Sequence, residues 1–335
     1  MLINSTIRVS APARLHLGFL DLNGSTGRKF GSIGLAIDSH RVVLNMQLQA
    51  ETSIVGTNIS PALSRRTQSI IDHFYISLGK NIPVAKQGVF IELIELIPPH
   101  AGLGSGTQLA IAICTVLCKL HNISASTRDI AEQLGRGARS GIGIATFDRG
   151  GFIVDGGLSK TSTTPPLLTR YDFPQNWRIV LIMDNNSQGI HGDQELLAFE
   201  NLAAFPLADS QAICHHVLMK LLPAIIEKKI VPFGQAITDI QSLIGDHFSP
   251  AQGGRFTSQR VSSLLLYAQN QGHTGIAQSS WGPTGCVFVE NDTAAQQLIS
   301  GLSHHIQQQN IDDTGLSFVT AKANENGAEI EITVP

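Results

Sequence analysis

A glycine-rich segment in the first half of the chain has the residue types that bind phosphate. It reads Gly102-Leu103-Gly104-Ser105-Gly106-Thr107-Gln108. Glycines let main-chain amides approach an anion closely, and the start of the apolar helix expected at 107–121 offers free N–H groups and a favourable dipole. Ser105 and Thr107 add hydroxyl donors. The segment is neither a Walker A loop nor a spaced GxGxxG. A tight strand–helix turn is the alternative, but the pattern favours phosphate binding.

A second glycine-rich segment carries two arginines. Residues 136–143 read RGARSGIG, in which Arg136, Arg139 and Ser140 are the polar side chains. Guanidinium groups pair bidentately with phosphate and carboxylate oxygens. The segment therefore predicts binding of such an anion, and the alternative is a solvated helix end with ordinary arginines.

Small hydroxyl residues surround a Gly-Pro corner in the second half of the chain. Ser279, Ser280, Gly282 and Thr284 lie between two expected strands, with Trp281 among them. Such a corner could close over a ligand, with the indole as a stacking surface, or serve only as a structural turn. These residues alone leave both interpretations open.

A cationic side chain and an imidazole share one face of the strand expected at 14–22. Because strand side chains alternate, Arg14 and His16 point to one side of the strand and their leucine neighbours to the other. The pair suits an anionic substrate. A chance pair on a solvated face is the alternative.

The carboxylates offer candidates for a magnesium ion but no fixed ligand set. Mg²⁺ binds one or two carboxylates together with substrate phosphates and water. The candidates are Asp21, Asp155, Asp193 and Glu195. The last two equally suit the positive end of the helix that follows them. The cysteines form no CxxC pair and the histidines no HxxxH spacing, so a zinc site is not expected.

The hydrophobic pattern predicts a two-domain α+β protein. In the first half, strands are expected at 7–11, 14–22, 32–37, 41–50, 89–96 and 150–157, and helices after Ser60 and at 107–121 and 127–134. The second half has expected strands at 177–183, 275–279, 285–290, 316–322 and 328–334, and helices near 194–204, 210–222, 232–246, 255–271 and 293–309. A polar, proline-ended stretch separates the halves, so the expected domains are residues 1–160 and 167–335.

Composition excludes several functional classes. Only 15% of the 335 residues are charged and the net charge is −3, which gives no electrostatic case for nucleic acid. A hydrophobic content of 42% excludes a disordered chain. The sequence shows no signal peptide and no apolar run long enough to span a bilayer, so we expect a cytoplasmic protein without a membrane partner.

Together these segments resemble the GHMP superfamily of small-molecule kinases, named for galactokinase, homoserine kinase, mevalonate kinase and phosphomevalonate kinase. Ala11 to Arg14 resembles its first motif, Pro98 to Gln108 its phosphate loop, and Ser279 to Thr284 its third motif. The resemblance implies a βαβ-rich N-terminal domain, a ferredoxin-like C-terminal domain and an active site in the cleft between them.

Two positions depart from the kinase pattern. Many of these kinases have Lys at the position of Arg14, and an Asp after a segment that resembles Ser140-Gly141, where this chain continues with Ile142. The Asp would orient or deprotonate the acceptor hydroxyl. Phosphoryl transfer relies mostly on positioning and charge stabilisation, so it is not excluded, but an ordinary kinase is disfavoured.

A closer resemblance is to the β-ribofuranosylaminobenzene 5'-phosphate synthase family. The matching segments are Arg14 to Asp21, Gly102 to Gln108, Arg136 to Gly143, Phe152 to Gly157 and Gln252 to Phe256. Members condense phosphoribosyl pyrophosphate with 4-aminobenzoate or 4-hydroxybenzoate. They release pyrophosphate and carbon dioxide and form a carbon–carbon glycoside on the route to tetrahydromethanopterin. The resemblance implies this decarboxylating glycosyltransferase activity, with no organic cofactor.

The resemblance also implies roles for the candidate residues. The loop from Gly102 to Thr107 would hold pyrophosphate, Arg136 and Arg139 would bind phosphate or the aromatic carboxylate, and Arg14 and His16 would act at the reacting centre. A magnesium ion and a homodimer are expected. Two alternatives remain: an ATP-dependent GHMP-type kinase acting on a small alcohol, and a ligand-binding relative without catalytic activity.

Overall fold

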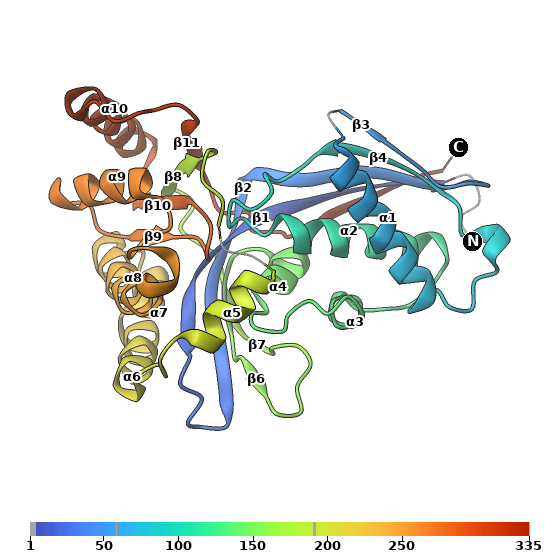
Figure 1. The fold of residues 1–335 in the computed structure, drawn as a ribbon, viewed down its shortest axis with the longest axis horizontal. Helices are drawn as coiled ribbons and strands as arrows, with labels where there is room; N and C mark the ends of the chain where they lie inside the picture. Colours follow the sequence, from blue (N-terminus) through green and yellow to red (C-terminus); the bar gives the residue numbers. More distant parts are fainter. Residues whose placement is uncertain (1–4, 58, 190–191, 335) are drawn as a thin grey trace.

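The chain forms two β-sheets with helices packed on both (Figure 1). The computed structural model describes residues 5–57, 59–189 and 192–334, except for the side chains of residues 193–196. The first sheet is made of β1 (Thr6–Asp21), β2 (Arg28–Leu48), β3 (Ser53–Gly56), β4 (Val89–Glu95), β5 (Phe152–Asp155), β6 (Leu158–Ser159), β7 (Leu167–Tyr171) and β12 (Glu329–Thr333). Its main path runs β12-β1-β2-β4-β3, while β5 and β6 pair with β2, and β7 with β5.

The second sheet is made of β8 (Arg178–Asp184), β9 (Ile276–Gln278), β10 (Thr284–Val289) and β11 (Leu316–Ala321). It is antiparallel, in the order β11-β8-β10-β9. Helices separate β8 from β9, and α10 (Asp292–Gln309) separates β10 from β11. The other helices of this half are α5 (Asp193–Asn201), α6 (Leu207–His216), α7 (Leu222–Ile226), α8 (Ile230–Gln252) and α9 (Gln259–Asn270), with a π-helical turn η2 (Val217–Leu221) before α7. This topology is ferredoxin-like, which confirms the predicted fold class.

The first two strands are longer than expected. The sequence predicted four short strands between residues 7 and 50, but β1 and β2 form one long hairpin. Register shifts interrupt their pairing between Pro12 and Ala13 and between His16 and Gly18. Such irregularities bend a strand and re-aim its side chains without ending it. The second shift lies directly at the predicted catalytic histidine.

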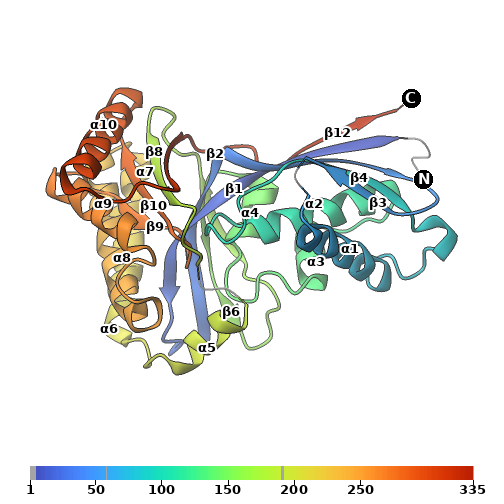
Figure 2. The same cartoon turned by 45° about the horizontal axis from the view of Figure 1, so that its top comes forward.

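Four helices cover one face of the first sheet (Figure 2). They are α1 (Pro61–Ile76), α2 (Ser105–Leu120), α3 (Thr127–Gln133) and α4 (Ile142–Arg149), and a short 3-10 turn, η1 (Val84–Lys86), precedes β4. Ser60 caps α1 by accepting a hydrogen bond from the Leu63 amide at 3.2 Å, as its sequence predicted. Helix α4 was missed, because its glycine and β-branched residues have low helix propensity and only burial stabilises it there.

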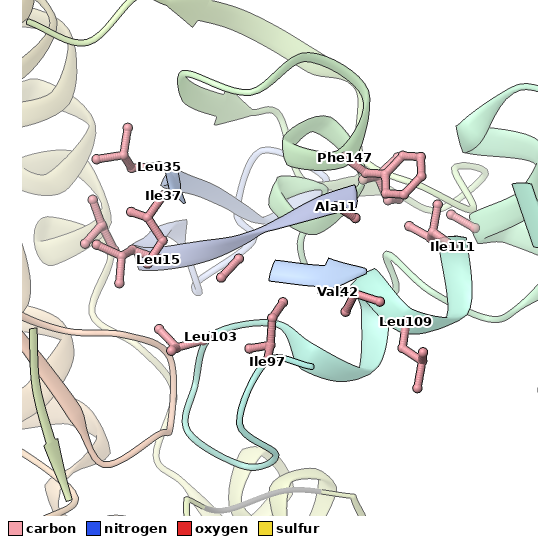
Figure 3. Packing of buried hydrophobic residues seen from close by; sticks show 14 of the residues in the cluster. Ala11, Leu15, Leu35, Ile37, Val42, Ile97, Leu103, Leu109, Ile111 and Phe147 are labelled. Atoms are coloured by element: carbon pink, nitrogen blue, oxygen red, sulfur yellow. The ribbon is translucent and has the colours of Figure 1, made fainter. Parts of the chain in front are cut away.

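No single position in the chain separates the residues of the first sheet from those of the second. Strands β7 and β12 both lie beyond residue 160, yet they pair in the first sheet. One hydrophobic cluster also contains residues of both sheets, from Leu15 and Leu103 to Phe233 and Phe288. Figure 3 shows part of it, with Leu103 of the glycine-rich segment next to Ile97. No helix among the described residues is both long and apolar enough to cross a membrane.

The glycine-rich loop after β4 meets the turn between β9 and β10 at main-chain contact. The Ser279 hydroxyl donates to the Gly102 carbonyl at 2.7 Å and accepts from the His16 amide at 3.1 Å. A Cβ on Gly282 would overlap the main chain of Ala101 and Gly102. The hydroxyl and the glycine therefore hold β1, the loop and the turn together.

We expect Gly282→Ala to lower the free energy of unfolding by about 1–3 kcal/mol, because the added methyl group forces these two main chains apart. Urea denaturation measures the change. Gly301→Ala on α10 is the matched control, since its methyl group meets nothing closer than the Tyr267 hydroxyl at 3.4 Å. Equal stability of the Gly282 variant and the wild type would contradict the tight contact.

Candidate active site

The glycine-rich loop ends at the start of α2. Gly104 is the N-cap of α2 and has a φ of 84°, a left-handed conformation that favours glycine. The amides of Thr107 and Gln108 donate to the Gly104 carbonyl at 3.1 and 3.0 Å. The amides of Ser105 and Gly106 lie earlier in the first turn, where a helix supplies no acceptor. They are the main-chain donors that the site offers to an anion.

Arg14 reaches this loop from β1. Its guanidinium Nη1 donates to the Gly102 carbonyl, and its main-chain amide donates to the Leu103 carbonyl at 3.1 Å. A Cβ on Gly104 would lie 3.1 Å from Arg14 Cγ and 3.3 Å from Nε. The Arg14 side chain therefore packs on the loop and places a positive charge beside the start of α2.

Arg66 of α1 is a further cation at this helix start, and no motif in the sequence predicted it. Its guanidinium occupies the space that a Cβ on Gly106 would need. Burial, and then the charge of Arg66, lower the pKa of Arg136. The Nε atom of Arg136 is buried and has no hydrogen-bond partner in the described part of the chain. Neighbouring cations repel each other, and an anion bound between them removes that cost.

Helical spacing is the signal that could have found Arg66. Ile70 is buried in the core, and Arg66 lies one turn before it on the covered side of α1. Arg65, the next residue toward the N-terminus, is exposed.

His16 lies close to both Arg14 and Arg139. Burial, then the charge of Arg14 and, more weakly, that of Arg139 lower the pKa of its imidazole to about 3, so the ring is neutral at pH 7. Its Nε2 atom is buried without a hydrogen-bond partner among the described residues. The Arg139 guanidinium carbon lies 5.0 Å from the centre of the Phe199 ring. The structure thus brings together predicted residues of three segments. Arg14 and His16 come from β1, Arg139 comes from residues 136–143, and Arg14 contacts the glycine-rich loop.

Other predicted residues hold the site together. The buried Gln108 side chain donates from Nε2 to the Gly143 carbonyl at 2.8 Å, which joins α2 to α4. Ser140 Oγ accepts from the Ile142 amide at 3.2 Å, and the Ser280 amide donates to the His16 carbonyl at 3.0 Å.

Thr284 lies in β10 opposite Met183, and its buried hydroxyl has no partner among the residues described. The corner at 279–284 therefore acts at least as a structural junction.

Two of the four candidate metal ligands are occupied by main-chain amides. Asp21 Oδ1 accepts from the Asn23 amide at 2.8 Å and the Gly24 amide at 3.0 Å. Asp155 accepts from the Gly141 and Gly157 amides at 2.8 and 2.9 Å. The side chains of Asp193 and Glu195 lie outside the described residues. Within the described part of the chain, no three His, Cys, Asp or Glu side chains form a metal-binding group.

Asp155 supports the segment that carries Arg139 and Ser140, and it makes stability depend on pH. Burial raises the pKa of its carboxyl to about 6 from an ordinary value of 3.8. The folded state therefore binds the proton more tightly, and stability is lost as pH rises through 6. We expect wild type to lose about 2–3 kcal/mol relative to Asp155→Asn between pH 4 and 7.5. Urea denaturation at a series of pH values measures this, and a pH-independent difference would refute it.

Arg66 should bind the anion and Arg65 should not. We expect Arg66→Ala to weaken the binding of pyrophosphate about ten-fold or more, since it removes one charge-assisted contact. Arg65→Ala, the neighbouring exposed arginine, is the matched control and should bind as wild type does. Isothermal titration calorimetry gives both affinities. Equal losses in the two variants would indicate only a general charge effect.

Two family profiles match the chain. The one described as "GHMP kinases N terminal domain" matches residues 62–151, and the one described as "GHMP kinases C terminal" matches residues 221–308. Homoserine kinase from Cytophaga hutchinsonii has a TM-score of 0.64 at 17% identity, covering 97% of both chains. Mevalonate diphosphate decarboxylase from Enterococcus faecalis has a TM-score of 0.66 at 17% identity, covering 98% of this chain and 99% of that one. These likenesses show the fold alone.

Two curated relatives are more similar in sequence. The β-ribofuranosylphenol 5'-phosphate synthase of Archaeoglobus fulgidus is 32% identical over 338 residues, covering 97% of this chain and 100% of the relative. The protein of the same name from Methanocaldococcus jannaschii is 34% identical over 299 residues, covering 84% and 88%. The chain therefore belongs to the GHMP kinase superfamily and, within it, to the β-ribofuranosylphenol 5'-phosphate synthase family.

Proposed function

We propose that this protein is a decarboxylating glycosyltransferase that joins phosphoribosyl pyrophosphate to 4-hydroxybenzoate, with release of pyrophosphate and carbon dioxide. The name of its relatives contains a ribofuranosyl phosphate joined to a phenol. A phenol product favours 4-hydroxybenzoate over 4-aminobenzoate as the acceptor. The predicted place in tetrahydromethanopterin biosynthesis fits this product.

The observation that carries the proposal is the group of cations at the start of α2. Loss of pyrophosphate leaves positive charge on the anomeric carbon and adds negative charge to the leaving group. We assign the amides of Ser105 and Gly106, with Arg14 and Arg66 beside them, to that growing negative charge. Donors that are already in place lower the barrier without reorganisation.

The acceptor attacks through the ring carbon that bears its carboxylate. Loss of carbon dioxide then restores aromaticity. A carboxylate that must leave should not be held strongly by a cation in the transition state. We therefore assign Arg136 and Arg139 to the phosphates of the donor rather than to the carboxylate of the acceptor.

A magnesium ion is part of the proposal as a companion of the pyrophosphate. With the carboxylates of Asp21 and Asp155 occupied by amides, most of its ligands would be pyrophosphate oxygens and water. A cytoplasmic location and a homodimer stay predictions.

The proposal predicts carbon dioxide release that depends on both substrates. The protein, Mg²⁺, phosphoribosyl pyrophosphate and carboxyl-labelled 4-hydroxybenzoate should release labelled carbon dioxide and pyrophosphate in equal amounts. We expect Arg14→Ala to lower kcat about 100-fold or more, because it removes charge from the leaving-group site. Arg65→Ala should leave the rate unchanged. No release from either benzoate, together with ADP formation from ATP and a small alcohol, would instead establish the kinase alternative.

A further inference from the structure

A small cavity with aromatic and polar walls lies beside His16. Phe19, Phe248 and Trp281 line it together with the imidazole. The His16 and Phe19 rings lie 4.7 Å apart, and the Phe248 and Trp281 rings 4.4 Å apart, measured between centres. The cavity has a volume of about 30 Å³, enough for a hydroxyl or amino group or for one or two waters. A six-membered ring could place only its tip there.

The imidazole offers this cavity a hydrogen-bond acceptor. Burial and the charge of Arg14 keep the pKa of His16 low, so the ring is neutral and one of its two nitrogens carries no proton. Nε2 is buried, and no described residue hydrogen-bonds to it. In a neutral imidazole, the nitrogen without the proton is an acceptor. A buried acceptor left without a donor is costly, so its partner is expected to be a ligand or a water.

His16 lies close to Arg14 of the candidate anion site, and its ring lines the cavity. Arg14 contacts the glycine-rich loop two residues before His16 in β1. The Ser280 amide binds the His16 carbonyl and the Ser279 hydroxyl binds its amide, so the main chain at His16 is fixed on both sides. Two substrates that meet beside His16 must therefore bring a charged leaving group on one and a hydrogen-bond donor on the other.

We propose that His16 Nε2 accepts the hydrogen bond of the 4-hydroxyl group of the aromatic acceptor and takes its proton as the carbon–carbon bond forms. This inference rests on the proposed function. The hydroxyl group at the tip of the ring enters the cavity, and the carboxyl-bearing carbon at the other end of the ring points toward the donor. His16 is thereby a general base that acts at the atom para to the bond being made.

The electrons and protons balance over the two steps. First, the ring carbon bearing the carboxylate bonds to the anomeric carbon, the anomeric carbon–oxygen bond breaks, and pyrophosphate leaves with that electron pair. The hydroxyl proton moves to Nε2, which leaves a cyclohexadienone. Next, the bond to the carboxylate breaks, carbon dioxide departs, and the electron pair restores the aromatic ring. The phenolate oxygen then takes the proton back from His16, so the imidazole returns to its starting state.

A weakly basic imidazole is suited to this proton. A phenol hardly gives its proton to such a base before reaction, but an alkylated, cationic ring makes the hydroxyl group a strong acid. The low pKa of His16 therefore keeps the acceptor lone pair free until the bond forms. A protonated imidazole would present an N–H group toward the hydroxyl and lose this preference for a donor.

The test separates binding from proton transfer. Quenching of Trp281 fluorescence reports affinity for 4-hydroxybenzoate, benzoate and 4-methoxybenzoate, and Trp177→Phe removes the signal of the second tryptophan. In the Trp177→Phe protein that retains His16, we expect 4-hydroxybenzoate to bind at least ten-fold more tightly than either analogue. A buried acceptor rejects a ligand that lacks the donor. His16→Phe should bind all three with similar affinity and lower kcat 100-fold or more.

Two further variants sharpen the result. His16→Gln retains an acceptor oxygen but cannot take a proton, so it should keep the preference for 4-hydroxybenzoate while its kcat falls. His304→Gln, at an exposed position of α10, is the control and should match the parent chain. A His16→Phe variant that keeps the ten-fold preference would overturn the proposal.

A measurement on the unmodified protein covers the case in which a variant fails to fold. In protein labelled with ¹⁵N-histidine, the Nε2 resonance of His16 should shift on addition of 4-hydroxybenzoate and not of benzoate. An unchanged resonance on saturation would also overturn the proposal. If carbon dioxide is not released but this shift and the binding preference are present, the proposed reaction fails while the hydroxyl site stands.

Discussion

The contact between the glycine-rich loop and the β9–β10 turn fixes where the start of α2 lies relative to His16. The loop belongs to the first sheet and the turn to the second, and their main chains touch where Gly102 meets Gly282. The Ser279 hydroxyl sits at this point and joins the Gly102 carbonyl to the His16 amide. The distance from the amides at the start of α2 to the imidazole is thus set by a few main-chain contacts. Such preorganisation is what electrostatic catalysis needs.

Charge is scarce in this chain, and its placement is therefore informative. Only 15% of residues are charged, yet Arg14 and Arg66 both contact the start of α2, and Arg136 lies close to Arg66. Asp21 and Asp155 turn their carboxylates to main-chain amides. The net charge of −3 excludes a global attraction for anions and leaves a local one intact.

Features encoded in short stretches of sequence were predicted, and features created by packing were not. The cap at Ser60 and the glycine-rich turn before α2 depend on neighbouring residues, so their patterns were readable. Helix α4 has low propensity and exists through burial, so its glycine-rich start resembled a loop. Arg66 contacts Gly106 only because α1 and α2 pack together. The pairing of β12 with β1 joins the two ends of the chain, which no local pattern encodes.

The missing acid of the kinase pattern has a chemical explanation in this site. An alcohol must lose its proton from the atom that attacks, so a kinase benefits from a base beside that atom. A carbon nucleophile carries no such proton, because its attacking atom holds a carboxylate that leaves as carbon dioxide. The only proton that must move is on the hydroxyl group across the ring. Two features fit a base that acts at the hydroxyl group instead of at the attacking atom. The residue after Ser140-Gly141 is the apolar Ile142, and the neutral His16 lies beside the cavity. One fold can thus retain its anion site and change its reaction by moving a single proton acceptor.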